Sequence, residues 1–157
     1  MLKKPSYDEL INRNLSLEKE VADINRLTET LKYEKKFSET ILDSLPGIFY
    51  LYDESGILIR WNKNHERITG FAPADLLKRK QLDWFKDDEK QLIIAEIKKV
   101  FEKGGSEVET YLEVHGGEKV PFLLTGRRLI VDNKKYLLGV GIDLTKIKHM
   151  EEALRRE

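Results

Sequence analysis

The chain has 157 residues, and its 28 lysine and arginine residues balance its 28 aspartate and glutamate residues, so the formal net charge is zero. The charges also balance region by region, and a nucleic-acid-binding protein needs a basic face or tail, so we expect no nucleic-acid partner. The absence of cysteine excludes disulfides, thiolate nucleophiles, iron–sulfur clusters and cysteine-ligated zinc. No apolar run approaches the ~18 residues of a membrane span, and the N-terminus lacks a signal-peptide core, so we predict a cytoplasmic protein without membrane insertion.

The first 45 residues predict one long helix, because they contain a single proline and no glycine. Ser6 and Glu9 have capping-box spacing at its start, and Pro46 and Gly47 end it. Hydrophobic residues recur every seven positions, which makes a seam that a partner helix must cover. We predict a coiled-coil segment over residues 1–36 that joins two chains in a homodimer; a lone helix folded back on its own domain is the alternative. The seam consists of Leu10, Asn14, Leu17, Val21, Ile24, Thr28 and Leu31.

Residues 48–61 predict a β-hairpin. The hydrophobic period changes to two over 48–52 and 57–61, and the turn residues 53–56 separate the two runs. The alternation places four large side chains on one face of the strand pair, namely Ile48, Tyr50, Ile59 and Trp61.

Three helices are predicted after the hairpin from their capping and stop signals. They are expected over 63–69, capped by Asn62 and ended by Gly70; over 74–80, opened by Pro73; and over 88–103, opened by a capping box of Asp88 and Gln91 and ended by Gly104 and Gly105.

Three strands and a last helix complete the chain. The strands are expected over 107–115, 120–130 and 135–144, with His115 on the charged face of the first. Thr145 is expected to cap a helix over 146–156. This element order predicts an α+β fold in which a five-stranded antiparallel sheet has helices over one face.

Residues 37–146 resemble the PAS sensor domain. The run LDSLPGIFYLYDESGILIRWNKNHERITGF is similar to the family's leading helix, hairpin and first inner helix, with Asn62 and Gly70 where such residues usually stand. The run YLLGVGIDLT is similar to its last strand and the exit to a signalling helix. The resemblance implies a sensory module of a bacterial signalling protein, usually a sensor histidine kinase. Residues 147–157 would then begin a signalling helix, and because no stop signal ends it, we expect a fragment whose output domain is missing.

No catalytic constellation stands out in the sequence. There is no GxxxxGK[ST] phosphate loop and no GxSxG elbow, and the three histidines lie far apart. His65 and Glu66 superficially resemble the phosphoacceptor box of histidine kinases, but Gly70 ends that helix within a turn or so and no ATP-binding domain follows. We predict no enzymatic activity and no metal site.

The predicted ligand site is the cleft between the inner face of the sheet and the helices. Trp61, His65 and Thr69 are spaced so that they share one face, and an apolar cavity with a few polar groups is the usual form of a small-molecule site. A packed core without a ligand is the alternative, and His65 is either a pH-sensitive pocket residue or a structural histidine. The predicted site consists of Tyr50, Trp61, His65, Thr69, Trp84, Phe85, Ile97 and Phe101.

The resemblance also narrows the range of cofactors that the domain could bind. The family's flavin photosensors and photoactive yellow protein need a cysteine, which this chain lacks. Its haem-binding members use a histidine on the long helix, and residues 88–103 contain none. Non-covalent flavin stays open, and a colourless metabolite or lipid-like molecule is the expected ligand.

Asp143 and Thr145 are predicted to carry the signal to the exit helix. A carboxylate and a hydroxyl at a strand-to-helix break can cap exposed N–H groups and fix the direction of the helix; a cap without a signalling role is the alternative. Two functions therefore stay open, a sensor that a ligand alters and a structural module that dimerises and relays without one.

Overall fold

The computed structural model describes residues 2–156. The chain divides into two compact units, one that extends to Ile41 and one that begins at Leu42. Among residues 2–156, no helix combines the length and the apolar character that crossing a membrane requires.

The first unit is made by most of helix α1 (Tyr7–Asp43). The predicted capping box is confirmed, because the backbone N–H of Ser6 donates to Glu9 (3.1 Å) and the N–H of Glu9 donates to the Ser6 hydroxyl (3.2 Å). No residue of α1 is buried, and every large apolar side chain of the predicted seam is exposed, from Leu10 at 44% to Leu31 at 70%. A single chain therefore leaves the seam uncovered, and the coiled coil stays a prediction.

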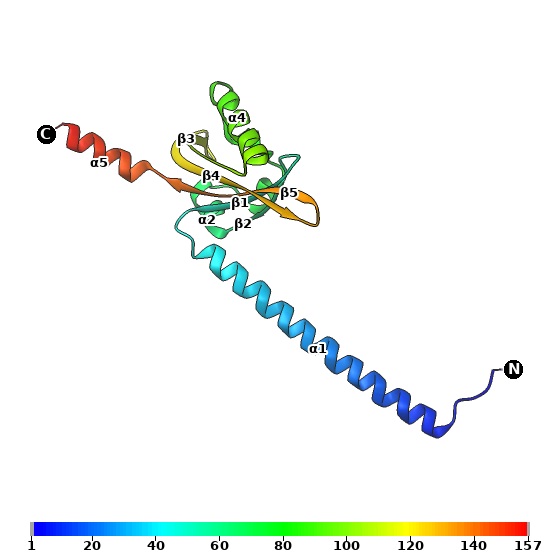
Figure 1. The fold of residues 1–157 in the computed structure, drawn as a ribbon. Helices are drawn as coiled ribbons and strands as arrows, with labels where there is room; N and C mark the ends of the chain where they lie inside the picture. The colour runs from blue at the N-terminus through cyan, green and yellow to red at the C-terminus, as the bar shows by residue number, and fades with distance from the viewer. Residues whose placement is uncertain (1, 157) are drawn as a thin grey trace. The chain divides into compact units, whose positions relative to one another are not determined.

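The second unit is built on a five-stranded antiparallel sheet in the order β2-β1-β5-β4-β3 (Figure 1). The predicted fold class is therefore confirmed. The strands are β1 (Ile48–Asp53), β2 (Leu58–Trp61), β3 (Gly105–Glu113), β4 (Lys119–Val131) and β5 (Lys134–Asp143).

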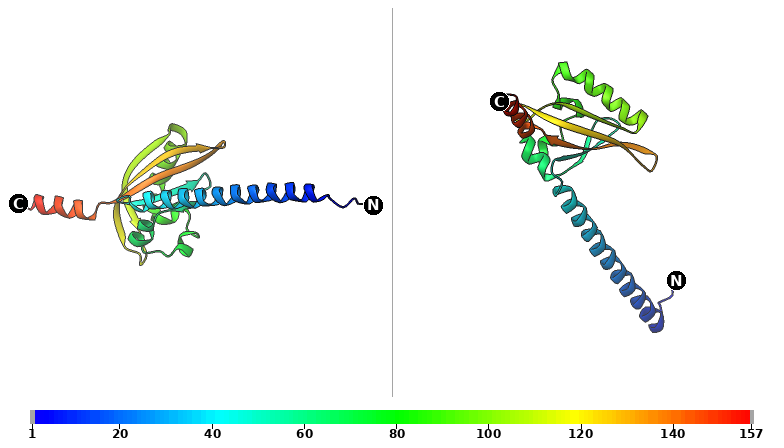
Figure 2. Two further views of the ribbon diagram at one scale, coloured as in Figure 1. Left: turned by 90° about the horizontal axis from the view of Figure 1, so that it is seen from below. Right: turned by 60° about the vertical axis from the view of Figure 1, so that its left-hand side comes forward.

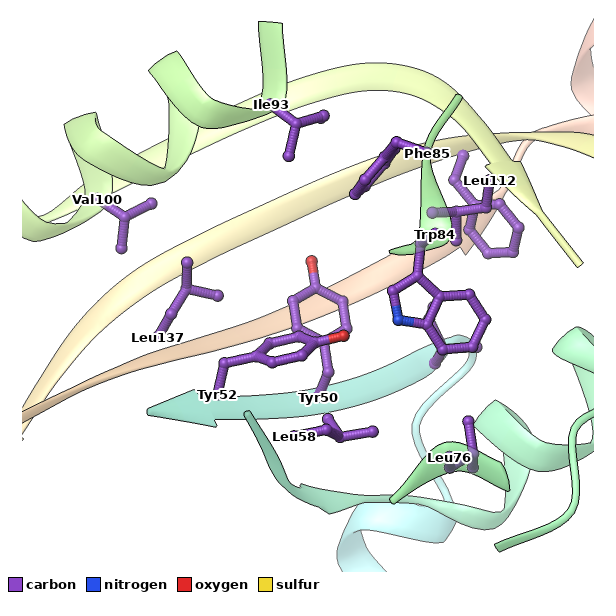
Figure 3. Close-up of a cluster of buried hydrophobic side chains, with 12 residues drawn as sticks. Tyr50, Tyr52, Leu58, Leu76, Trp84, Phe85, Ile93, Val100, Leu112 and Leu137 are labelled. Atoms are coloured by element: carbon purple, nitrogen blue, oxygen red, sulfur yellow. The ribbon is translucent and has the colours of Figure 1, made fainter. Parts of the chain in front are cut away.

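Helices pack against one face of this sheet, which we call the inner face; the green helix α4 can be followed along the sheet in Figure 2. They are α2 (Lys63–Thr69), α3 (Pro73–Leu76), the 3₁₀ helix η1 (Gln81–Trp84) and α4 (Asp87–Lys103); α5 (Thr145–Arg155) follows β5. Strand alternation explains the core, because the buried side chains of Tyr50, Tyr52, Leu112 and Leu137 all leave the same face. Side chains of α4 and η1 close the core from above (Figure 3).

Asn62 ties α2 to the start of the sheet. Its side-chain oxygen accepts from the N–H of His65 (3.1 Å), which is the predicted helix cap, and also from the N–H of Phe49 (3.0 Å). Its amide nitrogen donates to the carbonyls of Leu42 (2.8 Å) and Gly47 (3.1 Å). One buried amide therefore uses all its main hydrogen-bonding directions and sets where His65 begins the inner layer.

The hairpin differs from the predicted alternation at Ile59. A β-bulge between Leu51 and Tyr52 pairs Tyr52 with Leu58, so Leu58 takes the inner position and is buried while Ile59 is 46% exposed. Placing Ile59 on the inner face was therefore wrong, because a bulge shifts every following residue by one position.

Two predicted helices have different bounds. α3 ends at Leu76 instead of residue 80, because the N–H groups of Lys78 and Arg79 bond three residues back and tighten the chain into a turn. α4 begins at Asp87 after Lys86, which makes no side-chain cap, so the expected capping box at Asp88 does not start it.

Two predictions near strand ends were also wrong. His115 lies in an exposed turn after β3 rather than on the strand, because β3 ends at Glu113. The N-cap residue of α5 is Leu144 and not the predicted Thr145, and the Leu144 side chain makes no capping hydrogen bond. The turns at Gly116 and Gly117 and at residues 132–133 form as expected, all with positive φ.

Candidate functional site: a small inner cavity

A cavity of about 70 Å³ lies between the inner face of the sheet and α4 (Figure 3). Water occupies about 30 Å³ in the liquid, so this space holds about two water molecules. The lining residues are Ile48, Tyr50 and Tyr52 of β1; His65; Gln81, Trp84 and Phe85; Ile93, Glu96, Ile97 and Val100 of α4; Ser106, Val108 and Leu112 of β3; Leu124, Thr125 and Gly126 of β4; and Leu137 of β5.

Five of the eight predicted site residues line this cavity, namely Tyr50, His65, Trp84, Phe85 and Ile97. The other three lie elsewhere. The indole Nε1 of Trp61 donates to Glu66 (3.0 Å), the hydroxyl of Thr69 donates to the carbonyl of His65 inside α2, and Phe101 is a half-buried residue packed against the core.

Sequence reasoning missed Tyr52 and most of the wall that β3 and β4 provide. The signal was present for Val108 and Leu112, because strand alternation already placed both on one face. For Tyr52 the signal was its two-residue spacing from Tyr50. No local pattern marks Gly126, whose lack of a side chain leaves room for the side chain of Val100.

The hydroxyl of Tyr50 reaches from the cavity into the sheet. It donates to the backbone carbonyl of Thr125 (2.5 Å) at a place where the ladder between β4 and β5 is altered. There the N–H of Val140 donates to the Thr125 hydroxyl (3.1 Å) and that hydroxyl donates to the Val140 carbonyl (3.0 Å). Gly139 makes this approach possible, because a Cβ at that position would overlap the Tyr50 ring. The cavity is thereby connected to the centre of β5.

Three neighbouring residues that line the cavity carry polar side-chain atoms, and we call these atoms the polar end: the Tyr52 hydroxyl, Trp84 Nε1 and His65 Nδ1. Nε1 of Trp84 and Nδ1 of His65 are buried without a hydrogen-bond partner. The Tyr52 hydroxyl lies next to the indole nitrogen of Trp84 and interacts with it (Figure 3). The rings of His65 and Trp84 are in contact, with centroids 5.1 Å apart.

Burial keeps these groups uncharged. Desolvation lowers the pKa of His65 to about 4, so its imidazole is neutral at neutral pH. Desolvation also raises the pKa of Tyr50 and of Tyr52 well above the usual value, so both phenols keep their protons. A pH response of His65 near neutrality, which the sequence left open, does not fit this environment.

Two charged residues frame the cavity. The guanidinium of Arg79 lies 4.4 Å from the ring centre of Trp84 and 4.3 Å from that of Phe71, and holds the indole in place without lining the cavity. Glu96 does line it. Its carboxylate accepts from the Ser106 hydroxyl and from Lys99 (3.1 Å), and these partners lower its pKa.

The exit from the sheet contains the predicted relay residues. The carboxylate of Asp143 accepts from the N–H (2.8 Å) and the hydroxyl (2.5 Å) of Thr145, so the acid bonds the first residue of α5. The intervening Leu144 is buried, and its N–H donates to the carbonyl of Pro121 (2.8 Å). The start of α5 is therefore attached to both β5 and β4.

Comparisons with known proteins agree with this architecture. A family model for the PAS domain matches residues 46–146. The PAS domain of an HTR-like protein from Haloarcula marismortui has 16% identity and a TM-score of 0.63, with 76% of this chain and 98% of that chain covered. A PAS domain from Colwellia psychrerythraea has 20% identity and a TM-score of 0.64, with 71% and 97% covered.

A PAS domain from a two-component sensor histidine kinase has 12% identity and a TM-score of 0.61, with 71% of this chain and 97% of that chain covered. No curated protein matches the chain. PAS domains are generally sensory modules without catalytic activity. The family model covers well over half of the sequence, and the solved PAS domains share the fold; the chain belongs to the PAS domain family.

Proposed function

We propose that the chain is a sensory module in which a small molecule in the inner cavity alters the sheet and, through it, the start of α5. The supporting observation is the cavity itself, because two of its lining residues, Trp84 and His65, each have a buried polar atom without a partner. A buried polar group left unpaired costs about 1–3 kcal/mol, so a ligand that pairs these atoms recovers part of that cost. Sensing then requires that the ligand bind the two states of the domain with different affinity.

The route that we propose runs through Tyr50. Its hydroxyl is the group that connects the cavity wall to Thr125 and Val140 in the altered part of the ladder. From Val140, β5 continues to Asp143, whose carboxylate bonds Thr145 at the start of α5. A small change of the Tyr50 ring therefore acts on the strand that leads into the helix.

The parent protein is, in this proposal, a two-component histidine kinase that dimerises through α1 and carries its output domain after α5. Support comes from the structural likeness to the PAS domain of a two-component sensor histidine kinase. The exposed heptad seam supports the dimer, because such a seam is covered by a partner helix in a coiled coil.

The same seam favours a second candidate function, a structural module that dimerises and relays a signal without a ligand. The two candidates share the fold and the dimer. They differ in whether the cavity takes an occupant and whether occupancy reaches α5.

Xenon provides a direct test, because it enters small apolar cavities. We would record amide spectra of the isotope-labelled chain under xenon pressure. A sensor predicts shifts of the cavity amides, such as Val108, together with a shift of Thr145. Ile97→Phe fills the cavity and should abolish both shifts. Ile94→Phe, on the exposed side of the same helix, should leave them unchanged.

Each outcome separates the candidates. Shifts at Val108 without a shift at Thr145 would reject the relay and favour the structural module. An absence of any xenon-induced shift would reject the sensory proposal, because no accessible cavity would exist.

A further inference from the structure

The polar end of the cavity is built to receive a hydrogen-bond acceptor. Tyr52, Trp84 and His65 are 4%, 3% and 2% exposed, so bulk water does not satisfy their polar atoms. The indole N–H of Trp84 only donates, the hydroxyl of Tyr52 has a proton to donate, and a neutral imidazole presents either a donor or an acceptor. The set therefore contains two donors and one group that adapts.

The charges around the cavity disfavour a negatively charged ligand. Glu96 is the one lining residue that is charged at neutral pH, and it is negative. No lysine or arginine lines the cavity to compensate an anion. A buried anion without a partner is costly.

A positively charged ligand is disfavoured for a different reason. An aromatic wall attracts cations through the faces of its rings, but one face of Trp84 is already covered by the guanidinium of Arg79. The free edge of the same indole presents its N–H to the cavity, and that edge carries partial positive charge. Glu96 does not restore the attraction, because Lys99 already pairs with it.

We propose that the cavity binds a small uncharged molecule with one acceptor oxygen, of the class of short amides and ketones. Its oxygen accepts from the indole N–H of Trp84 and the hydroxyl of Tyr52, and its alkyl part lies against Ile97 and Leu112. This inference rests on the proposed sensory function, because it names the ligand class of the same cavity. It goes beyond that function in specifying charge and polarity.

The volume of the cavity limits the size of the ligand, and the size of the ligand limits its affinity. A molecule of about four non-hydrogen atoms takes roughly the space of two waters, ~60 Å³, and the cavity offers about 70 Å³. At about 1 kcal/mol for each atom of so small a ligand, the dissociation constant is on the order of 1 mM.

Three probes of one shape and different charge test the inference: acetamide, acetate and acetamidinium. The chain has two tryptophans, so its amide spectrum contains two indole N–H signals, which a Trp61→Phe variant assigns. We expect acetamide to shift the Trp84 signal saturably at millimolar concentration. The Trp61 signal should not move, because its N–H is held by Glu66 outside the cavity. Acetate and acetamidinium, at matched ionic strength, should leave both signals in place.

A variant separates hydrogen bonding from simple filling. Tyr52→Phe removes one donor and keeps the ring, so acetamide should bind about fivefold more weakly while xenon still enters. Tyr111→Phe, on an exposed tyrosine of β3, is the matched control and should not change the acetamide affinity.

The failures of this inference and of the proposed function are distinguishable. If acetate or acetamidinium binds as well as acetamide, or if only xenon enters, the ligand class is wrong and the sensory cavity stands. If Tyr52→Phe binds acetamide as tightly as the wild type, the assigned hydrogen bond is wrong. If neither xenon nor any probe shifts a cavity signal, both proposals fall.

Discussion

Replacing Asn62 by alanine should destabilise the domain more than any other single polar substitution in the α2 region. The side chain makes four hydrogen bonds to backbone groups, and Asn62 itself is 2% exposed. Alanine removes the helix cap, which is worth about 1 kcal/mol. It also leaves the N–H of Phe49 and the carbonyl of Gly47 buried without this partner, at about 1 kcal/mol or more each.

The expected loss is therefore about 3 to 4 kcal/mol, a large part of the ~5–15 kcal/mol that stabilises an ordinary domain. Urea unfolding followed by tryptophan fluorescence measures this loss as a lower transition midpoint. The matched control is Asn64→Ala two positions later, which removes one amide bond to the carbonyl of Leu45 (2.6 Å) and one to Arg67. If Asn62→Ala loses no more stability than Asn64→Ala, the account of Asn62 as the tie between α2 and the sheet is refuted.

Three further predictions concern burial, backbone packing and assembly. His65 becomes protonated in the unfolded chain between pH 7 and pH 4, whereas burial holds its pKa at about 4 in the fold, so acidification should lower the free energy of unfolding by about 3 kcal/mol. The urea midpoint of a His65→Gln variant should fall less over the same pH range than that of the wild type. An equal fall would show that His65 is not the cause of the loss. The Cβ of a Gly139→Ala variant would overlap a carbonyl oxygen of β4, so this variant should lose about 3 kcal/mol or more of stability in thermal unfolding. In Gly105→Ala the nearest atom lies 3.4 Å from the added Cβ, so the loss of stability should be small. Similar losses in the two variants would contradict the packing explanation. Lysine at both Leu17 and Ile24 should produce monomers in analytical ultracentrifugation, and a persistent dimer would reject the seam.

The pattern of local signals was sufficient for much of the fold. The capping box of Ser6 and Glu9, the cap at Asn62 and the left-handed Gly70 all act within a few residues of where they stand. Strand alternation likewise places Val108 and Leu112 of β3 on one face, although the predicted site did not include them. These features depend on backbone geometry and hydrogen bonds over one turn or one strand, so a single sequence contains them.

Which residues line the cavity could be determined only from the assembled structure. Trp61 and Tyr52 are both aromatic residues of the hairpin, yet Tyr52 lines the cavity and Trp61 bonds Glu66 away from it. A bulge beside Tyr52 determines which residues of β2 face inward, and no residue type in the sequence indicates that bulge. His65 is similar, because its low pKa comes from walls that other elements supply.

The sequence alone thus determined the long heptad helix, the element order and the family, because periodicity and capping are local properties of the chain. Only the tertiary structure decided which side chains surround the cavity, that the Tyr50 hydroxyl enters the ladder at Thr125, and that Trp84 Nε1 and His65 Nδ1 are buried. Burial and electrostatic environment are sums over residues far apart in sequence, and they exist only once the sheet and α4 have closed on each other.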